Sequence, residues 1–137
     1  MKATDLMVGD LFKAVDYNSP FRITAIYDDV VQTQADYQSE IDGNWYSEAE
    51  IKDLIPIELT EDILVKNGFS EIHHPGTGAT DEYSEWFFGG IKIIEWLEDW
   101  KYHYFSAGGD GAPIDFQYVH QLQHLLRLCG IEKEIEL

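Results

Sequence analysis

The chain has few basic residues: nine Lys and Arg stand against 26 Asp and Glu, a formal net charge of −17 over 137 residues. Nucleic-acid binding draws much of its free energy from counterions that Lys and Arg release from phosphates, and a polyanion gains none of it. Such a chain also lacks the attraction that brings basic segments to anionic lipid. The composition therefore argues against direct binding to nucleic acid or to a membrane.

Cysteine and long apolar runs are scarce as well. A single cysteine, Cys129, excludes an internal disulfide and a thiolate zinc cluster, and its place in an apolar helical stretch predicts a small core residue. No segment approaches the roughly 18 to 20 apolar residues that a membrane helix needs, and the N-terminus has no apolar run of signal-peptide length. We therefore expect a cytoplasmic protein.

Apolar residues are plentiful in spite of the charge. Hydrophobic residues make up 45% of the sequence and aromatic residues 14%, which is too much for a disordered chain and enough for one good core or two small ones. The acidity therefore belongs to the surface of a folded protein, and we expect salt to stabilise it by screening like charges.

Residues 11–59 read as a series of short strands, because their apolar runs have a period near two. These runs lie at 11–15, 21–27 and 30–33. A capping-box pattern at 47–50 predicts one short helical turn, and an apolar run at 55–59 closes the segment. Closing a small sheet hides its edges, so this pattern predicts an SH3-like small β-barrel over residues 1–59.

The segment after the predicted barrel starts with a short helix. Thr60 is placed to cap it, acids at 61–62 favour its N-terminus, and Asn67-Gly68 supplies a left-handed stop. An antiparallel meander should follow, with Gly89-Gly90 as a hairpin turn. Its strand-like runs lie at 69–72, 83–88, 91–97 and 100–105.

A C-terminal amphipathic helix is the clearest predicted element. Its apolar residues recur at helical spacing: Val119, Leu122, Leu125, Leu126 and Cys129. Gly130 ends it, and the alternating residues 132–137 predict an edge strand. The expected fold class is α+β: an N-terminal SH3-like small β-barrel, then residues 60–137 as an antiparallel sheet packed against the C-terminal helix, either separate from the barrel or in one compact unit with it.

Three segments carry a resemblance to a known family. They are Val8-Gly9-Asp10, the run from Ile55 to Thr60 with Ile63-Leu64 and Asn67-Gly68-Phe69 after it, and Tyr118 to Gln123 with Gly130 after it. In these segments the chain resembles a family of small uncharacterised proteins common in gut Bacteroidetes genomes and their mobile elements. The resemblance implies a bacterial, intracellular protein, and it carries over no activity and no catalytic residue.

One pair of histidines on the predicted C-terminal helix is a candidate metal site. His120 and His124 are one helical turn apart, so their rings can converge on one ion. The residue after His120 is not the Glu of a metalloprotease helix, and Arg127 on the same face weakens the affinity for a cation. The alternative is a polar stripe that is solvated or paired with acids.

A second histidine pair, His73-His74, precedes Asp81-Glu82 in a polar, glycine-rich stretch. Such a loop attracts these residues with or without a metal. The glycine-rich stretch 76–78 lacks the third glycine and the following helix of a phosphate-binding loop, and the stretch 108–111 lacks its Lys and its Ser or Thr. We predict no catalytic residue, no metal and no cofactor.

The aromatic run at 100–105 offers a candidate binding surface. Alternation sends Trp100, Tyr102 and Tyr104 to one face of a strand, which is either core under the C-terminal helix or an exposed interface. The candidate interaction surface combines this face with the cationic stripe of the helix. Its residues are Trp100, Tyr102, Tyr104, His120, His124 and Arg127.

The sequence thus predicts a non-enzymatic protein-binding or adaptor module that acts on a protein partner. Two alternatives stay open. One is an acidic nucleic-acid mimic from a mobile element that inhibits a basic partner, and the other is a metal-dependent enzyme that uses histidines and carboxylates. Neither the identity of the partner nor the oligomeric state follows from the sequence.

Overall fold

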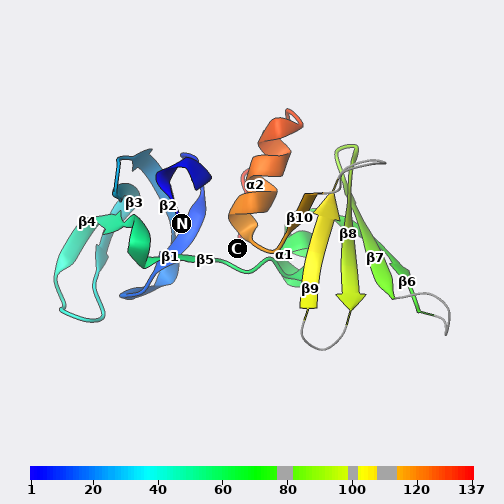
Figure 1. Ribbon diagram of the computed structural model, residues 1–137, viewed down its shortest axis with the longest axis horizontal. Helices are drawn as coiled ribbons and strands as arrows, with labels where there is room; N and C mark the ends of the chain where they lie inside the picture. Colours follow the sequence, from blue (N-terminus) through cyan, green and yellow to red (C-terminus); the bar gives the residue numbers. More distant parts are fainter. Residues whose placement is uncertain (77–81, 99–101, 108–113) are drawn as a thin grey trace. The chain divides into compact units, whose positions relative to one another are not determined.

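The fold is known from a computed structural model, which describes the backbone of residues 1–76, 82–98, 102–107 and 114–137. The chain divides into two units, Met1–Ile57 and Glu58–Leu137. Each unit contains one five-stranded antiparallel sheet, and the second also contains two α-helices (Figure 1). The predicted α+β class is therefore confirmed. Within the described ranges, no helix has the length and apolar character needed to cross a membrane.

The sheet of the first unit is curled and has the strand order β4-β3-β2-β1-β5. Its elements are η1 (Ala3–Asp5), β1 (Leu11–Ala14), β2 (Tyr17–Ile26), β3 (Val30–Gln38), β4 (Trp45–Glu50), η2 (Ile51–Asp53) and β5 (Leu54–Pro56). Because the three-residue β5 pairs with β1, strands β4 and β5 form the two ends of the sheet. The sheet is an open half-barrel, so the closed SH3-like barrel expected from the sequence is not confirmed.

The core of the first unit is built from alternate apolar positions of the strands. It contains Leu6, Phe12, Ala14, Phe21, Ile23, Val31, Ala49, Ile51 and Leu54. Ala49 pairs with Val31 of β3, so residues 47–50 form part of a strand. The helical turn predicted there is wrong, because burial of Ala49 and pairing with β3 outweigh the local capping preference. A 3₁₀ turn follows only after the strand, at η2.

The second unit has the strand order β10-β9-β8-β7-β6. Its elements are α1 (Glu61–Lys66), β6 (Ser70–His74), β7 (Tyr83–Phe88), β8 (Ile91–Glu98), β9 (Tyr102–Ala107), β10 (Ile114–Phe116) and α2 (Val119–Leu128). Gly89 and Gly90 connect β7 and β8 with φ of 54° and 85°, which confirms the predicted hairpin turn. The short strand β10 has no counterpart in the sequence prediction.

Helix α1 has the caps that its sequence predicts. The Thr60 hydroxyl accepts a hydrogen bond from the Ile63 N–H at 3.3 Å, and Gly68 follows with φ of 85°. The buried Asn67 then holds the C-terminal segment: its Nδ2 donates to the Glu136 carbonyl at 2.7 Å and its Oδ1 accepts from the Glu136 N–H at 2.8 Å. Residues 132–137 are therefore anchored by a side chain, and the predicted edge strand is wrong.

Helix α2 buries the stripe that its spacing predicts, with Val119, Leu122 and Leu126 at most 1% exposed. The helix ends at Leu128, and Cys129 is its exposed C-cap residue. The prediction that Cys129 is a core residue is therefore wrong. Cys129 is the residue directly after Leu128, and Gly130 with φ of 72° then turns the chain away from the helix.

Candidate functional site

The aromatic part of the predicted interaction surface falls in and beside β9. Trp100 lies outside the described residues, and β9 begins at Tyr102. The backbone register places Tyr104 opposite Trp96 and Tyr102 opposite Glu98 of β8. The side chains of Tyr102 and Tyr104 also lie outside the described part of the structure. The aromatic face proposed there, as core or as interface, stays a prediction.

The histidine stripe of α2 is partly an interior feature. His120 is 7% exposed and stacks on Tyr118 with 6.0 Å between ring centroids. His124 meets His120 edge-on at 5.7 Å, and it lines a shallow groove of about 180 Å³ that also involves Leu128. Among the described residues, no third His, Cys, Asp or Glu completes a metal-binding group with this pair. Its geometry is that of an aromatic contact.

The other histidines, His73 and His74, are engaged separately. His73 Nδ1 lies 2.9 Å from the Ser84 hydroxyl, and its Nε2 lies 2.9 Å from a carboxylate oxygen of Glu82. His74 Nε2 lies 2.7 Å from a carboxylate oxygen of Glu85. Neighbouring residues of a strand face opposite ways, so the two rings have different partners. His73 and His74 therefore lie at the end of β6, not in the polar loop predicted from the sequence, and each is paired with its own acid.

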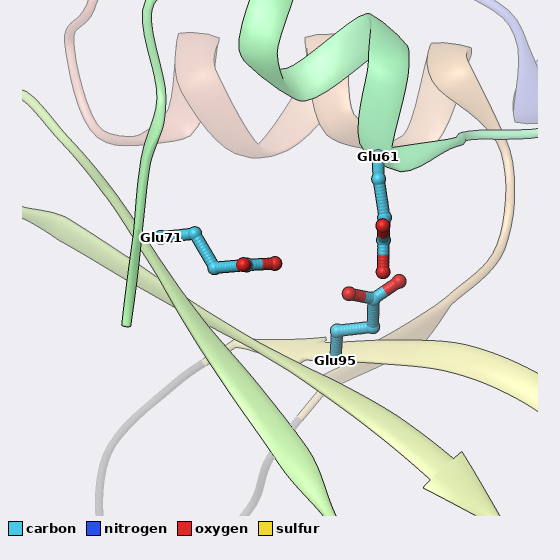
Figure 2. A group of neighbouring side chains, drawn as sticks. All are labelled: Glu61, Glu71 and Glu95. Carbon is cyan, nitrogen blue, oxygen red and sulfur yellow. The ribbon is translucent and has the colours of Figure 1, made fainter. Parts of the chain in front are cut away.

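Three glutamates meet in the second unit although no sequence motif links them. Figure 2 shows Glu61 of α1, Glu71 of β6 and Glu95 of β8 with their carboxylates directed toward one another, and oxygens of all three lie within 4.8 Å of each other. Glu95 is fully buried and accepts a hydrogen bond from the Trp86 indole at 3.1 Å. Carboxylate oxygens are the ligands that Ca²⁺ and Mg²⁺ prefer. Carboxylates of this kind also gather without any ion, and nothing else in the cluster points to a ligand.

Strands β3 and β4 form a hairpin at one end of the sheet of the first unit (Figure 1). Several apolar side chains at the end of this hairpin are exposed. We call this surface the acidic tip. It consists of Asp16, Glu40, Ile41, Asp42, Trp45 and Tyr46. Ile41 is 75% exposed, Trp45 67% and Tyr46 37%. Single exposed apolar residues are ordinary, but these three lie within six consecutive residues, with Trp45 and Tyr46 on opposite faces of β4.

Hydrogen bonds hold the loop of the acidic tip in one conformation. The Ser39 N–H donates to the Asn44 carbonyl at 2.9 Å, and the Asn44 N–H donates to the Asp42 carboxylate at 2.8 Å. The Glu40 N–H donates to the Asp16 carbonyl at 2.7 Å, which ties the loop to the turn between β1 and β2. The apolar side chains are therefore presented by a preorganised loop.

Aromatic stacking fixes the base of the acidic tip. The ring of the buried Tyr37 lies 5.0 Å from Tyr17, 6.1 Å from Phe21 and 6.0 Å from Tyr46. The Tyr46 hydroxyl donates to the Asp42 carboxylate. Trp45 pairs with Gln38 across the hairpin, and its ring is left largely to solvent. Tyr46 thus anchors the tip to the core, while Trp45 faces outward.

The acidic tip lies in a strongly negative stretch of sequence. Residues 23–51 contain seven Asp and Glu and no Lys, Arg or His. Burial, with the nearby Asp16 charge, raises the pKa of Tyr37 to about 12. The hydrogen bond between them raises the pKa of Tyr46 and lowers that of Asp42. Asp42 is therefore charged and the tyrosines are neutral at physiological pH.

The sequence contained only a weak signal for this surface. Ile41, Trp45 and Tyr46 flank the turn-forming residues Asp42, Gly43 and Asn44. Exposure depends on where the hairpin ends relative to the core, which the local pattern does not encode. The three glutamates of Figure 2 were missed for a similar reason, since they come from separate elements.

The comparisons with known proteins add no assignment: no family model, curated protein or solved structure matches this chain.

Proposed function

We propose that this chain is a non-enzymatic protein-binding module and that the acidic tip is its docking surface. The observation that carries the proposal is the 67% exposure of Trp45 on a loop held by hydrogen bonds. Tryptophan and tyrosine are enriched among the residues that dominate binding energy at interfaces. A loop that is already ordered loses little conformational entropy when a partner docks.

The fold of the first unit is compatible with this role. We propose that its half-barrel is an SH3-like barrel left open along one seam, since five short antiparallel strands follow the order β4-β3-β2-β1-β5 with a 3₁₀ turn between β4 and β5. SH3 domains dock peptides against aromatic side chains. A fold does not by itself determine a function, so the proposal depends on Trp45 and not on the architecture.

The partner is proposed to be a cytoplasmic protein. The acidic composition argues against nucleic acid and anionic lipid as direct ligands. The resemblance to proteins of gut Bacteroidetes and their mobile elements stays a prediction, and it places such a partner in a bacterial cell.

The test is affinity capture from a lysate of the native host with three immobilised proteins: the wild-type chain, Trp45→Ala and Tyr27→Ala. Tyr27 is a matched control, because it is 51% exposed but lies at the turn between β2 and β3. We expect a partner, identified by mass spectrometry, that wild type and Tyr27→Ala retain and Trp45→Ala loses. With the purified partner, Trp45→Ala should weaken binding about 30-fold or more, the effect of a central interface residue.

Circular dichroism of each variant shows whether it is folded. Retention of the same partner by folded Trp45→Ala would refute the proposed docking surface. Turnover of a substrate by the purified protein, abolished by a point substitution, would refute the non-enzymatic part of the proposal.

A further inference from the structure

We propose that the acidic tip recognises an arginine-bearing segment of its protein partner, with a guanidinium stacked on Trp45 and the basic charge of the segment attracted by the carboxylates of the tip. This inference rests on the proposed function and names the chemistry of the partner at the same surface.

The charge of the acidic tip argues for a cationic partner. In the part of the chain that the structure describes, Asp16, Glu40 and Asp42 form no ion pair with Lys, Arg or His. Among the described residues of the first unit, Lys52 pairs with Glu50, close to the other end of β4. A cationic segment would complement this charge and be steered toward it.

The exposed indole of Trp45 favours arginine over lysine as the cationic residue of the partner. A cation over the face of Trp is attracted by the ring quadrupole, and arginine is found there more often than lysine. The planar guanidinium can stack on an aromatic ring and still direct its N–H groups at a carboxylate, which a compact ammonium group does less well. Trp45 supplies such a ring, within three residues of Asp42 along the chain.

The Asp42 carboxylate is held in place inside the acidic tip. One of its oxygens accepts from the Asn44 N–H at 2.8 Å, and the other accepts from the Tyr46 hydroxyl. The Ser39 and Asn44 side chains also hydrogen-bond this carboxylate, so its charge adds to the attraction while the carboxylates of Asp16 and Glu40 are the acceptors offered to a guanidinium. The neighbouring hydrogen bonds lock the group in place and reduce the entropy lost on binding.

An uncharged apolar partner fits the same surface less well. It would cover Ile41 and Trp45 but would also remove water from the nearby carboxylates without offering donors. Burying ionised groups without a partner is costly. A polyanionic partner would be repelled outright.

The test uses a fluorescent heptapeptide of alternating arginine and serine, with a citrulline version that keeps its shape and lacks its charge. Fluorescence anisotropy of the full-length chain should show saturable binding of the arginine peptide, none of the citrulline peptide, and weaker binding as salt rises from about 50 to 300 mM. Trp45→Ala should weaken binding about 3- to 30-fold, and Tyr27→Ala should leave it unchanged.

A pair of charge reversals separates a local contact from attraction to the general negative surface. Glu40→Lys and Glu132→Lys change the net charge equally, but only Glu40 belongs to the acidic tip, and both side chains are exposed. We expect Glu40→Lys to weaken peptide binding at least about 5-fold more than Glu132→Lys. Equal effects of the two reversals, or equal binding by wild type and Trp45→Ala, would overturn the inference.

Competition distinguishes this inference from the proposed function. If a partner captured through Trp45 is displaced by the arginine peptide and not by the citrulline peptide, the inference is supported. If the partner depends on Trp45 but is not displaced, the inference fails and the docking surface stands. If capture does not depend on Trp45, the proposed function itself fails.

Discussion

Asn67 links the end of α1 to the C-terminal segment, and replacing it should destabilise the second unit. Its amide is 2% exposed and makes two hydrogen bonds to the backbone of Glu136, at 2.7 and 2.8 Å, and one to the Ile63 carbonyl at 2.7 Å. In Asn67→Ala the Ile63 carbonyl keeps the bond from the residue 67 N–H. The N–H and the carbonyl of Glu136 lose the Asn67 amide as their hydrogen-bond partner.

The magnitude follows from those two lost bonds. Each is worth about 1 kcal/mol net, and a buried group left without a partner costs more, so Asn67→Ala should lower the free energy of unfolding by about 2–4 kcal/mol. That is a large share of the roughly 5–15 kcal/mol by which domains are stable. Local release of the C-terminal segment by about 2 kcal/mol corresponds to roughly 30-fold faster exchange of the Glu136 amide.

Two measurements check this prediction: urea unfolding followed by circular dichroism, and hydrogen exchange at the Glu136 amide. The matched control is Asn18→Ala, because Asn18 is exposed on β2 of the first unit and should change stability by less than about 0.5 kcal/mol. If Asn67→Ala is as stable as this control and its Glu136 amide stays protected, the role assigned to Asn67 is refuted.

Three further predictions concern electrostatics and burial. Because the pKa of Tyr37 is raised to about 12, the contribution of its neutral side chain to stability is complete below pH 10 and is lost as pH rises through about 12. Alkaline unfolding, followed by the absorbance of tyrosinate, should therefore occur at a higher pH in Tyr37→Phe than in the wild-type chain. Trp86→Phe removes the indole donor to the buried Glu95 and should cost about 1.5–3 kcal/mol in urea unfolding; a loss below about 0.5 kcal/mol would contradict it. Sodium chloride should raise the thermal midpoint of this protein, whose net charge is −17; a midpoint independent of salt would show that the acids do not repel one another appreciably.

The predictions that succeeded depend on interactions within a few residues. Thr60 caps α1, Gly89-Gly90 turns the hairpin, and the spacing of Val119, Leu122 and Leu126 defines the buried face of α2. Each feature follows from backbone preferences or from the helical period. A neighbouring element is not needed to select any of them.

The predictions that failed depend on a partner far away in the chain. Residues 47–50 carry a capping-box pattern, yet Ala49 pairs with Val31 of β3. The alternating residues 132–137 resemble a strand, yet their backbone bonds to the Asn67 side chain, 69 residues from Glu136. In both places a distant group offers better burial or hydrogen bonding than the local preference.

The properties of the acidic tip divide in the same way between those set by local sequence and those set by long-range packing. The sequence by itself determined the α+β class, the excess of acid and the stretch without any basic residue from 23 to 51. Only the tertiary structure decided that Trp45 is exposed on a fixed loop while Tyr46 is anchored through Tyr37. Composition and periodicity depend only on residues that are close together in the sequence. The exposure of a side chain depends on which strands pair and on where the core ends, and both are decided by long-range packing.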